Sequence, residues 1–287
     1  MKIYRYEAFT DKAGMGNPAG VVFECDDITE EEMQKTAGEI GFNETVFLLA
    51  SKTADIKMRY FTPGHEMNLC GHATIAGVYA LFEKENKEIK TVETLSGIIN
   101  VNMEIWNNGK TFIKMEQLPA QFEEFHGDKA KLAEALGIRE SDIEADFPVI
   151  YGSTGIWTLL VPVKNLDAFL KMKSDNKKFP EILTEKPKAS VHPFCLETYS
   201  ENADMHGRHF SSPFSGTVED PVTGTASGVM GAYYIKFIKP SDEENIVVEQ
   251  GHEIGKDGIV YVDVKKKDGN LDVEIKGEAV YAEEIFL

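Results

Sequence analysis

Two segments of the chain are apolar on almost every side. They cover residues 73–82 and 226–238, within the stretches "GHATIAGVYALF" and "GTASGVMGAYYIKF". A helix on the surface of a soluble protein has a polar face, which these segments nearly lack. We therefore expect two helices, each enclosed on most sides by other parts of the fold.

Most of the remaining chain alternates between apolar and polar residues or is rich in β-branched and aromatic residues, as is typical of strands. These stretches are residues 2–9, 19–23, 45–50, 55–61, 91–105, 111–117, 156–163, 189–199, 207–211, 246–249, 258–265 and 271–287. Asn-Asn-Gly at 107–109 and Asp-Gly at 268–269 predict hairpin turns. Three amphipathic surface helices are expected, the first beginning at a capping box at 29–32 and ending near Gly38 or Gly41, the others at 128–137 and 165–172.

A short repeat divides the chain into two halves. "ADIKMRYFTP" at 54–63 and "ADMHGRHFSSP" at 203–213 share Ala-Asp, then an arginine, a phenylalanine, a hydroxyl residue and a proline. Each is followed by Gly-x-Ala-Thr/Ser and one of the two apolar segments. This order predicts an α+β fold of two pseudo-symmetric domains, each a curved, rolled, mostly antiparallel sheet around a central buried helix. The expected domains are 1–118 and 119–275, with the final strand, about 276–287, returning to the first.

Composition narrows the class of protein. The formal net charge is −18, and a surface this acidic repels nucleic acid and anionic membranes. The three cysteines, at 25, 70 and 195, form no disulfide framework and favour a reducing, cytoplasmic setting. The N-terminal residues alternate like a strand and do not resemble a signal peptide, and no run of about 18 apolar residues predicts a membrane span.

The starts of the two buried helices are candidate binding positions. The first amides of a helix have no partner within the helix, and the helix dipole adds partial positive charge there. Gly71-His72 and Gly224-Thr225 could therefore hold a carboxylate without any lysine, and we expect them to face one cleft. Taken singly, each glycine could merely begin a helix.

Two acidic residues stand close to reactive positions. Glu44 comes just before an apolar strand, where it should be partly buried, and burial without a cation moves a carboxyl group toward the pKa range useful for proton transfer. The competing interpretation is a solvated glutamate at a strand edge. Asp220 precedes the second helix start as Cys70 precedes the first, although Asp-Pro is also a common turn pair.

Four motifs, in order along the chain, resemble the phenazine-biosynthesis PhzF-like family, which is related in fold to diaminopimelate epimerase. They are "GNPAGVV" at 16–22, "GFNETVF" at 41–47, "NLCGHATIAG" at 68–77 and "EDPVTGTASG" at 219–228. The resemblance implies two pseudo-symmetric halves with the active site between them. It also implies a cofactor-free isomerase, usually a homodimer, whose best-known member moves a proton within 2,3-dihydro-3-hydroxyanthranilate.

The resemblance also assigns residues. The family's catalytic glutamate, histidine and aspartate fall on Glu44, His72 and Asp220. Its second-helix hydroxyl residue, a serine in the phenazine enzyme, falls on Thr225. Asn17 matches the N-terminal loop, so the expected substrate-binding residues are Asn17, Gly71, Gly224 and Thr225.

One departure keeps a second activity open. Cys70 stands where the epimerase relatives carry a catalytic thiol, but the corresponding place at the second helix start reads Asp220-Pro221. A two-thiol racemase is thus disfavoured. The alternatives to an acid–base isomerase of a small carboxylated, amino-acid-like metabolite are a racemase or epimerase using Cys70 and a non-catalytic small-molecule-binding protein of the same fold.

Metal and dinucleotide chemistry fit the sequence poorly. His65, Cys70 and His72 are close in sequence, and His206 and His209 recur in the second half, but the spacing matches no common zinc pattern. Gly14, Gly16 and Gly20 lack the dinucleotide fingerprint, and a strand follows them. We therefore expect no metal and no cofactor.

Overall fold

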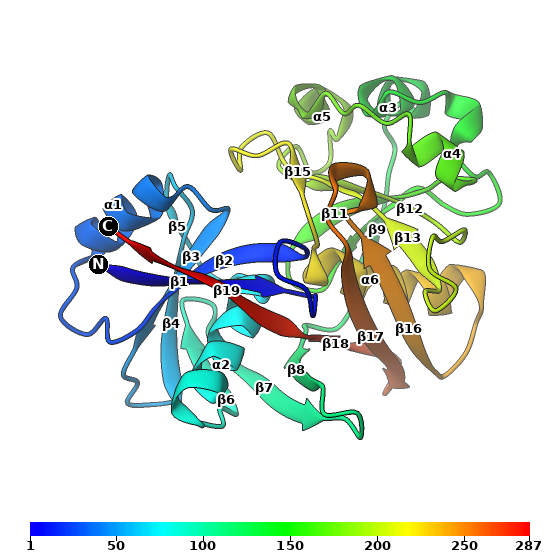
Figure 1. The fold of residues 1–287 in the computed structure, drawn as a ribbon. Coiled ribbons are helices and arrows are strands. Elements are labelled where there is room, and N and C mark those ends of the chain that lie inside the picture. Colours follow the sequence, from blue (N-terminus) through cyan, green and yellow to red (C-terminus); the bar gives the residue numbers. More distant parts are fainter. The chain divides into compact units, whose positions relative to one another are not determined.

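The chain divides into two units in the computed structural model, which describes residues 1–287. The first unit is Met1–Glu116 together with Lys276–Leu287, and the second is Gln117–Ile275. The C-terminal segment thus completes the first unit. Figure 1 shows the two chain ends side by side there, and the amide of Leu287 donates to the carbonyl of Met1 at 3.0 Å.

One mixed sheet forms most of the first unit. Its strands are β1 (Lys2–Ala8), β2 (Asn17–Val22), β3 (Glu44–Leu49), β4 (Ile56–Phe61), β5 (Glu66–Met67), β6 (Thr91–Thr94), β7 (Gly97–Ile105), β8 (Thr111–Glu116) and β19 (Ala279–Phe286). β1 pairs with β19 on one side and β2 on the other, both antiparallel. From β2 the neighbours run β3, β4, β6, β7 and β8, and only the β2–β3 and β4–β6 pairs are parallel.

The second unit repeats this pattern of pairing. Its strands are β9 (Gln121–Glu124), β10 (Ile150–Ser153), β11 (Trp157–Pro162), β12 (Ser190–Cys195), β13 (Met205–Gly207), β14 (His209–Phe210), β15 (Glu219–Asp220), β16 (Glu243–Gln250), β17 (Gly258–Lys267) and β18 (Asn270–Gly277). From β10 to β17 the pairs are antiparallel, parallel, antiparallel, parallel and antiparallel, as they are from β1 to β7. The sequence repeat therefore reflects a repeated topology.

Each unit has one central helix. In the first unit α2 (Gly71–Glu85) packs against β1, β2, β3, β8 and β19. In the second α6 (Gly224–Tyr233) packs against β10 and β17 and continues into a π-helical turn, Tyr234–Ile238. Glycines allow close contact: a Cβ at Gly231 would lie 2.7 Å from Val262 Cγ1. Because α2 is buried over most of its length from His72 to Leu81, and α6 over nearly all of its length, the lack of a polar face in the sequence is explained.

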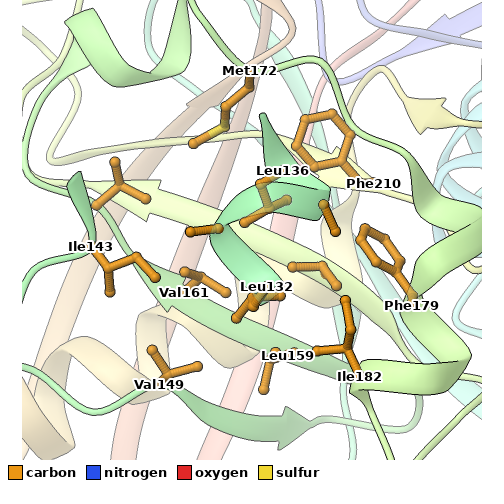
Figure 2. Close-up of a cluster of buried hydrophobic side chains, with 14 of the residues drawn as sticks. Leu132, Leu136, Ile143, Val149, Leu159, Val161, Met172, Phe179, Ile182 and Phe210 are labelled. Carbon is orange, nitrogen blue, oxygen red and sulfur yellow. The ribbon is translucent and has the colours of Figure 1, made fainter. Parts of the chain in front are cut away.

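Short helices cover the second unit with a further hydrophobic layer. They are α3 (Lys129–Leu136), α4 (Leu166–Phe169) and α5 (Phe179–Ile182), with 3₁₀ turns at Glu140–Asp142 and Asn176–Lys178. Figure 2 shows Leu132 and Leu136 of α3 packed among Leu159 and Val161 of β11 and Phe179 of α5. Since β11 has the central helix on one face and this layer on the other, its residues are buried on both sides.

The predicted fold class is confirmed, and the element boundaries differ in a few places. The capping box at Thr29 and the left-handed Gly41 bound α1 (Glu30–Ile40) as expected. Asp268 and Gly269, both with positive φ, join β17 to β18 as predicted, whereas the stretch 271–287 is two strands, β18 and β19, interrupted at Glu278. The strands β9 and β10 and the helix α5 were not predicted, because each has only four residues and shows no period.

Candidate active site

Glu44, Cys70 and His72 lie together in the first unit. His72 Nε2 is 3.1 Å from Glu44 Oε2, and Cys70 Sγ is 3.4 Å from His72 Nδ1. All three side chains are largely buried: His72 and Cys70 are less than a tenth exposed, and the Glu44 side chain is 15% exposed. The expectation of a partly buried Glu44 is thus met, and the alternative of a solvated strand-edge glutamate is wrong.

Two elements position this group. Glu44 is the first residue of β3, and Cys70 is the N-cap of α2, so both side chains stand at the ends of buried elements. The first turn of α2 is fixed to the sheet by Thr74, whose hydroxyl donates to the carbonyl of Cys70 at 2.7 Å and lies 2.8 Å from the hydroxyl of Tyr60 on β4. The imidazole of His72 is therefore held on a rigid support.

The charges of these groups depend on one another. Burial lowers the pKa of His72, but the acidic neighbours Cys70 and Glu44 raise it more. The pKa of His72 is therefore well above its ordinary value. Burial, and then the negative charge of Glu44, raises the pKa of Cys70. The raised pKa of each group favours its protonated form, and Glu44, 3.1 Å from His72 Nε2, is the acidic partner of the imidazole.

A second group of predicted residues lies in the second unit. Asp220 ends β15, and its carboxylate accepts a hydrogen bond from the hydroxyl of Thr223, the N-cap of α6. Gln250 supports both residues: its side-chain amide donates to the carbonyl of Asp220 at 2.8 Å and accepts from the amide of Thr223 at 3.1 Å. Gly224 and Thr225 follow as the first residues of α6.

The two central helices begin differently from the surface helices. Thr29, Asp128 and Asn165 each place a side-chain oxygen on amides of the first turn of α1, α3 and α4. Neither Cys70 nor Thr223 caps its helix in this way, and neither helix has an acidic residue in its first turn. The first turns of α2 and α6 thus lack the capping oxygen that the surface helices have, and a helix start of this kind can attract an anion.

The pairing register corrects one sequence expectation. Phe61 pairs with Glu66 as Phe210 pairs with Glu219, and the next pairs are Tyr60 with Met67 and His209 with Asp220. The counterpart of Asp220 in the first half is therefore Met67. The position equivalent to Cys70, the N-cap, is held by Thr223. Asp220 does not precede its helix as Cys70 does, because two further residues lie between Asp220 and the N-cap.

The remaining predicted residues are divided between the two units. Asn17 is the buried first residue of β2, and Gly71 is the first residue of α2, both in the first unit. Asp220, Gly224 and Thr225 belong to the second unit. The expectation that the two helix starts face one cleft stays a prediction.

The histidines considered for zinc do not form one cluster. His65 Nδ1 lies 3.2 Å from the hydroxyl of Thr62. His209 Nδ1 lies 3.2 Å from His192 Nδ1, and burial lowers the pKa of His209 to about 4. The ligand atoms of Glu44, Cys70 and His72 lie within 4.8 Å of one another, and so do those of His206, Glu249 and His252. Glutamates, which the sequence reasoning did not consider as ligands, complete both groups.

Thr223 and Gln250 are functional candidates that the sequence reasoning missed. Thr223 could have been found, because "VTGTASG" places a hydroxyl residue just before a helix-starting glycine. Gln250 has no such signal, since its contact with Asp220 joins residues 30 positions apart.

None of the helices combines the length and the apolar character that a membrane crossing requires.

Comparison with known proteins shows the family to which the chain belongs. A family model described as phenazine biosynthesis-like protein (PhzC-PhzF) matches residues 6–285. The uncharacterized isomerase YfhB of Bacillus subtilis is 53% identical over 98% of this chain and 97% of its own. Trans-2,3-dihydro-3-hydroxyanthranilate isomerase of Pseudomonas aeruginosa is 28% identical, with 98% of each chain covered.

Solved structures match as well. A crystal structure of a PhzF-family phenazine biosynthesis protein from Bacillus anthracis is 52% identical, with a TM-score of 0.97 over 99% of this chain and 98% of that one. A probable proline racemase from Agrobacterium radiobacter shares the fold alone, at 12% identity and a TM-score of 0.66 over 100% and 92% of the two chains. The chain therefore belongs to the PhzC-PhzF family of phenazine biosynthesis-like proteins and is an isomerase of that family.

Proposed function

We propose that this protein is a cofactor-independent isomerase that moves a proton within a small carboxylated, amino-acid-like molecule, with Glu44 as the group that carries the proton. One observation carries the proposal: the Glu44 carboxylate lies 3.1 Å from the His72 imidazole, in a largely buried position beside a helix start with no capping side chain. This arrangement offers a base, a charge partner and an anion-binding end within a few ångströms.

Glu44 first acts as the base. It takes a proton from an activated carbon of the substrate, so the C–H bond breaks, an O–H bond forms on the carboxyl group, and the electron pair enters the conjugated system of the substrate. Glu44 then returns a proton to a different carbon of the same system. His72 supports this cycle as the charge partner of Glu44, because its Nε2 lies 3.1 Å from the carboxylate that takes and returns the proton.

The helix start binds the substrate. The first-turn amides of α2 and the positive end of its dipole attract a carboxylate, and this is how a protein of net charge −18 can hold an acidic substrate. The name of the Pseudomonas relative, a dihydro-hydroxyanthranilate isomerase, supports a substrate that carries both a carboxylate and an amino group.

Asp220 and Thr225 complete the proposal. By the family resemblance, Asp220 takes part in catalysis and Thr225 donates a hydrogen bond to a substrate carboxylate at the uncapped start of α6. Asn17, Gly71 and Gly224 are assigned to substrate binding on the same basis. These assignments remain predictions, and each can be tested by substitution.

A racemase that uses Cys70 is the second candidate function. The fold shared with the proline racemase and the position of Cys70 at the α2 N-cap favour it. The equivalent N-cap in the second half is Thr223, whose hydroxyl is far less acidic than a thiol and is hydrogen-bonded to Asp220. Racemisation by two opposed thiols would therefore lack one of its two thiols. An isomerase that uses Glu44 is the better-supported function.

The experiment that tests the proposal uses deuterated water. The purified protein, with and without a chelator, is incubated with a panel of small unsaturated carboxylates and amino acids, including trans-2,3-dihydro-3-hydroxyanthranilate. The proposal predicts an isomer formed at a rate the chelator does not change, and this isomer gains deuterium, detected by proton NMR and mass spectrometry, wherever the proton on Glu44 exchanges with solvent before its return. Turnover that inverts a single stereocentre, with loss of activity in Cys70→Ser, would instead support the racemase.

A further inference from the structure

A second cluster of ionisable side chains lies in the second unit, apart from Asp220. His206 on β13 is fully buried, and its two ring nitrogens face two carboxylates: Nδ1 is 3.0 Å from Glu249 Oε1, and Nε2 is 3.0 Å from Glu253 Oε1. Glu249 is fully buried at the end of β16, and the Glu253 side chain is 5% exposed. His252 lies beside them, on the 3₁₀ turn His252–Ile254.

The donor atoms of this cluster are spaced for a metal ion. Single ligand atoms of His206, Glu249 and His252 all lie within 4.8 Å of one another. Donors on a tetrahedral zinc ion with bonds of about 2.0–2.2 Å stand about 3.3–3.6 Å apart, so shifts of about 1.5 Å or less would bring all three onto one ion. Two imidazoles and one carboxylate are also a donor set that zinc accepts with a fourth position open.

One buried nitrogen of the proposed ligand set, His252 Nδ1, lacks a hydrogen-bond partner. Buried polar atoms without partners are uncommon, and an ion is one of the explanations for them. His252 Nε2 is 3.8 Å from Asp257, so the unpartnered Nδ1 is the nitrogen of this ring that remains for a ligand.

The charge balance also favours a cation. Two buried carboxylates face one imidazole, and the other hydrogen bonds to Glu249 come from the neutral amides of Tyr199 and Ser200, so even a fully protonated His206 leaves the formal charge of the group negative. The guanidinium of Arg208 is engaged by both oxygens of Glu219, at 2.8 and 2.7 Å. A divalent cation would offset the remaining negative charge at a place from which water is largely excluded.

We propose that His206 Nδ1, Glu249 and His252 Nδ1 bind one divalent transition-metal ion of the zinc class, with Glu253 accepting the Nε2–H of His206. In that arrangement Glu253 fixes the tautomer and orientation of a metal-binding histidine, as carboxylates commonly do in zinc proteins. The ion would join β13, the end of β16 and the 252–254 turn, with a water molecule in its fourth position.

The metal would also act on the segment that holds Asp220. Gln250, which bonds to Asp220 and Thr223, directly follows Glu249 in the chain. Fixing Glu249 and His252 on one ion therefore restrains Gln250 from both sides. The expected consequence is a more stable second unit rather than a change in the chemistry at Glu44.

The test is zinc binding in a chain where the other possible ligand group has been removed. In a Cys70→Ser, His72→Gln background, metal-free protein is titrated with Zn²⁺ by calorimetry and with Co²⁺ by visible absorption. The proposal predicts one ion per chain, a tetrahedral cobalt spectrum and a higher unfolding midpoint at saturating Zn²⁺. Adding His252→Ala should weaken binding at least about tenfold and abolish the shift in midpoint.

Two further variants serve as a control and as a second test of the proposed metal site. His126→Ala removes an exposed histidine whose Nε2 lies 3.8 Å from Glu124, and it should leave zinc binding unchanged. Glu253→Gln, which keeps the size of the side chain, should weaken binding about tenfold or more. Absence of binding in the background protein, or an unchanged affinity in His252→Ala, would overturn the proposal and leave His206 as an imidazole held by two glutamates without metal.

Discussion

At the scale of single residues, the two halves differ most at Glu44. Thr45 pairs with Phe61 and Val191 pairs with Phe210, so the register gives Ser190 as the counterpart of Glu44. The hydroxyl of Ser190 donates to Thr158 at 2.9 Å and cannot serve as a base at neutral pH. An acidic residue at this position is thus confined to the first half, which fits a proton carried by one group rather than exchanged between two.

Cys70 should be secondary in catalysis. Its pKa is raised by burial and by Glu44, and its counterpart Thr223 is not a thiol, so we expect Cys70→Ser to keep activity within several-fold of the wild type and Cys70→Ala to fold normally. Steady-state rates and circular dichroism check this. A loss as large as that caused by replacing Glu44 would bring the thiol back into the mechanism.

His72 should titrate above its ordinary range. Its pKa in the folded protein is raised, so the stabilising contact with the Glu44 carboxylate is present just below the ordinary histidine pKa of about 6.5 and is lost as the pH rises through the raised value. When the imidazole ring nitrogens are followed by ¹⁵N NMR, His72 should stay protonated to a pH well above 6.5. Glu44→Gln should lower that midpoint, because it removes a negative charge 3.1 Å from Nε2. A His72 midpoint unchanged by Glu44→Gln would show that the two groups do not interact.

At the scale of elements, each half contains the same ion pair between the strand of the repeat and the short strand after it. Arg59 donates from Nε and Nη2 to both oxygens of Glu66, and Arg208 does the same to Glu219. Both guanidinium groups also lie over a phenylalanine two residues on, at 5.1 and 4.8 Å. The repeated arginine of the sequence is therefore structural, and it places the short strand that ends at Asp220.

Replacing Arg208 should destabilise the protein strongly. Arg208 is 6% exposed and also donates to the carbonyls of Phe169 and Met172, so Arg208→Met leaves Glu219 buried without its partner. Breaking a buried pair in this way costs about 3–5 kcal/mol. Urea unfolding measures the loss.

Arg139→Met is the matched control for that measurement. Arg139 pairs with Asp142, but its side chain is 77% exposed and solvent screens the pair, so the change should have little effect on stability. Equal effects of the two substitutions would contradict the structural role given to Arg208.

Local signals explain which elements could be predicted. The capping box at Thr29, the glycines at 41 and 137 and the Asp-Gly turn act within a few residues, so their outcome is readable from the chain. The strand β9, "QFEE", has one apolar residue and is set by pairing with β10 instead. Elements fixed by tertiary pairing leave no such local pattern.

At the scale of the whole molecule, the family resemblance predicted the fold and the isomerase class but not the side-chain contacts. Glu44 and His72 are 28 positions apart in the chain, and nothing local in the sequence says that their side chains meet at 3.1 Å. The same holds for Gln250 and Asp220, which β16 and β15 bring together. A homodimer is implied by the same resemblance and remains a prediction.

The C-terminal strand should be essential for the first unit. β19 pairs with β1 along its whole length, and α2 packs against it. Removing residues 279–287 would expose β1 as an open edge and uncover the central helix, so we expect the first unit to lose cooperative unfolding in urea. Removing Leu287 alone should leave the transition in place. A normal transition in the longer deletion would contradict the assignment of β19 to this unit.

The most direct test of the central claim is the rate of solvent-deuterium incorporation by Glu44→Gln on a substrate that the wild type isomerises, with Glu39→Gln, an exposed glutamate on α1, as control. General acid–base catalysis contributes about 10²–10⁴ in rate, and glutamine preserves the size of the side chain. The account predicts that Glu44→Gln folds and binds the substrate but incorporates deuterium at least about a hundredfold more slowly, while Glu39→Gln matches the wild type. Incorporation by Glu44→Gln at near the wild-type rate would contradict the account and move the proton transfer to His72 or Asp220.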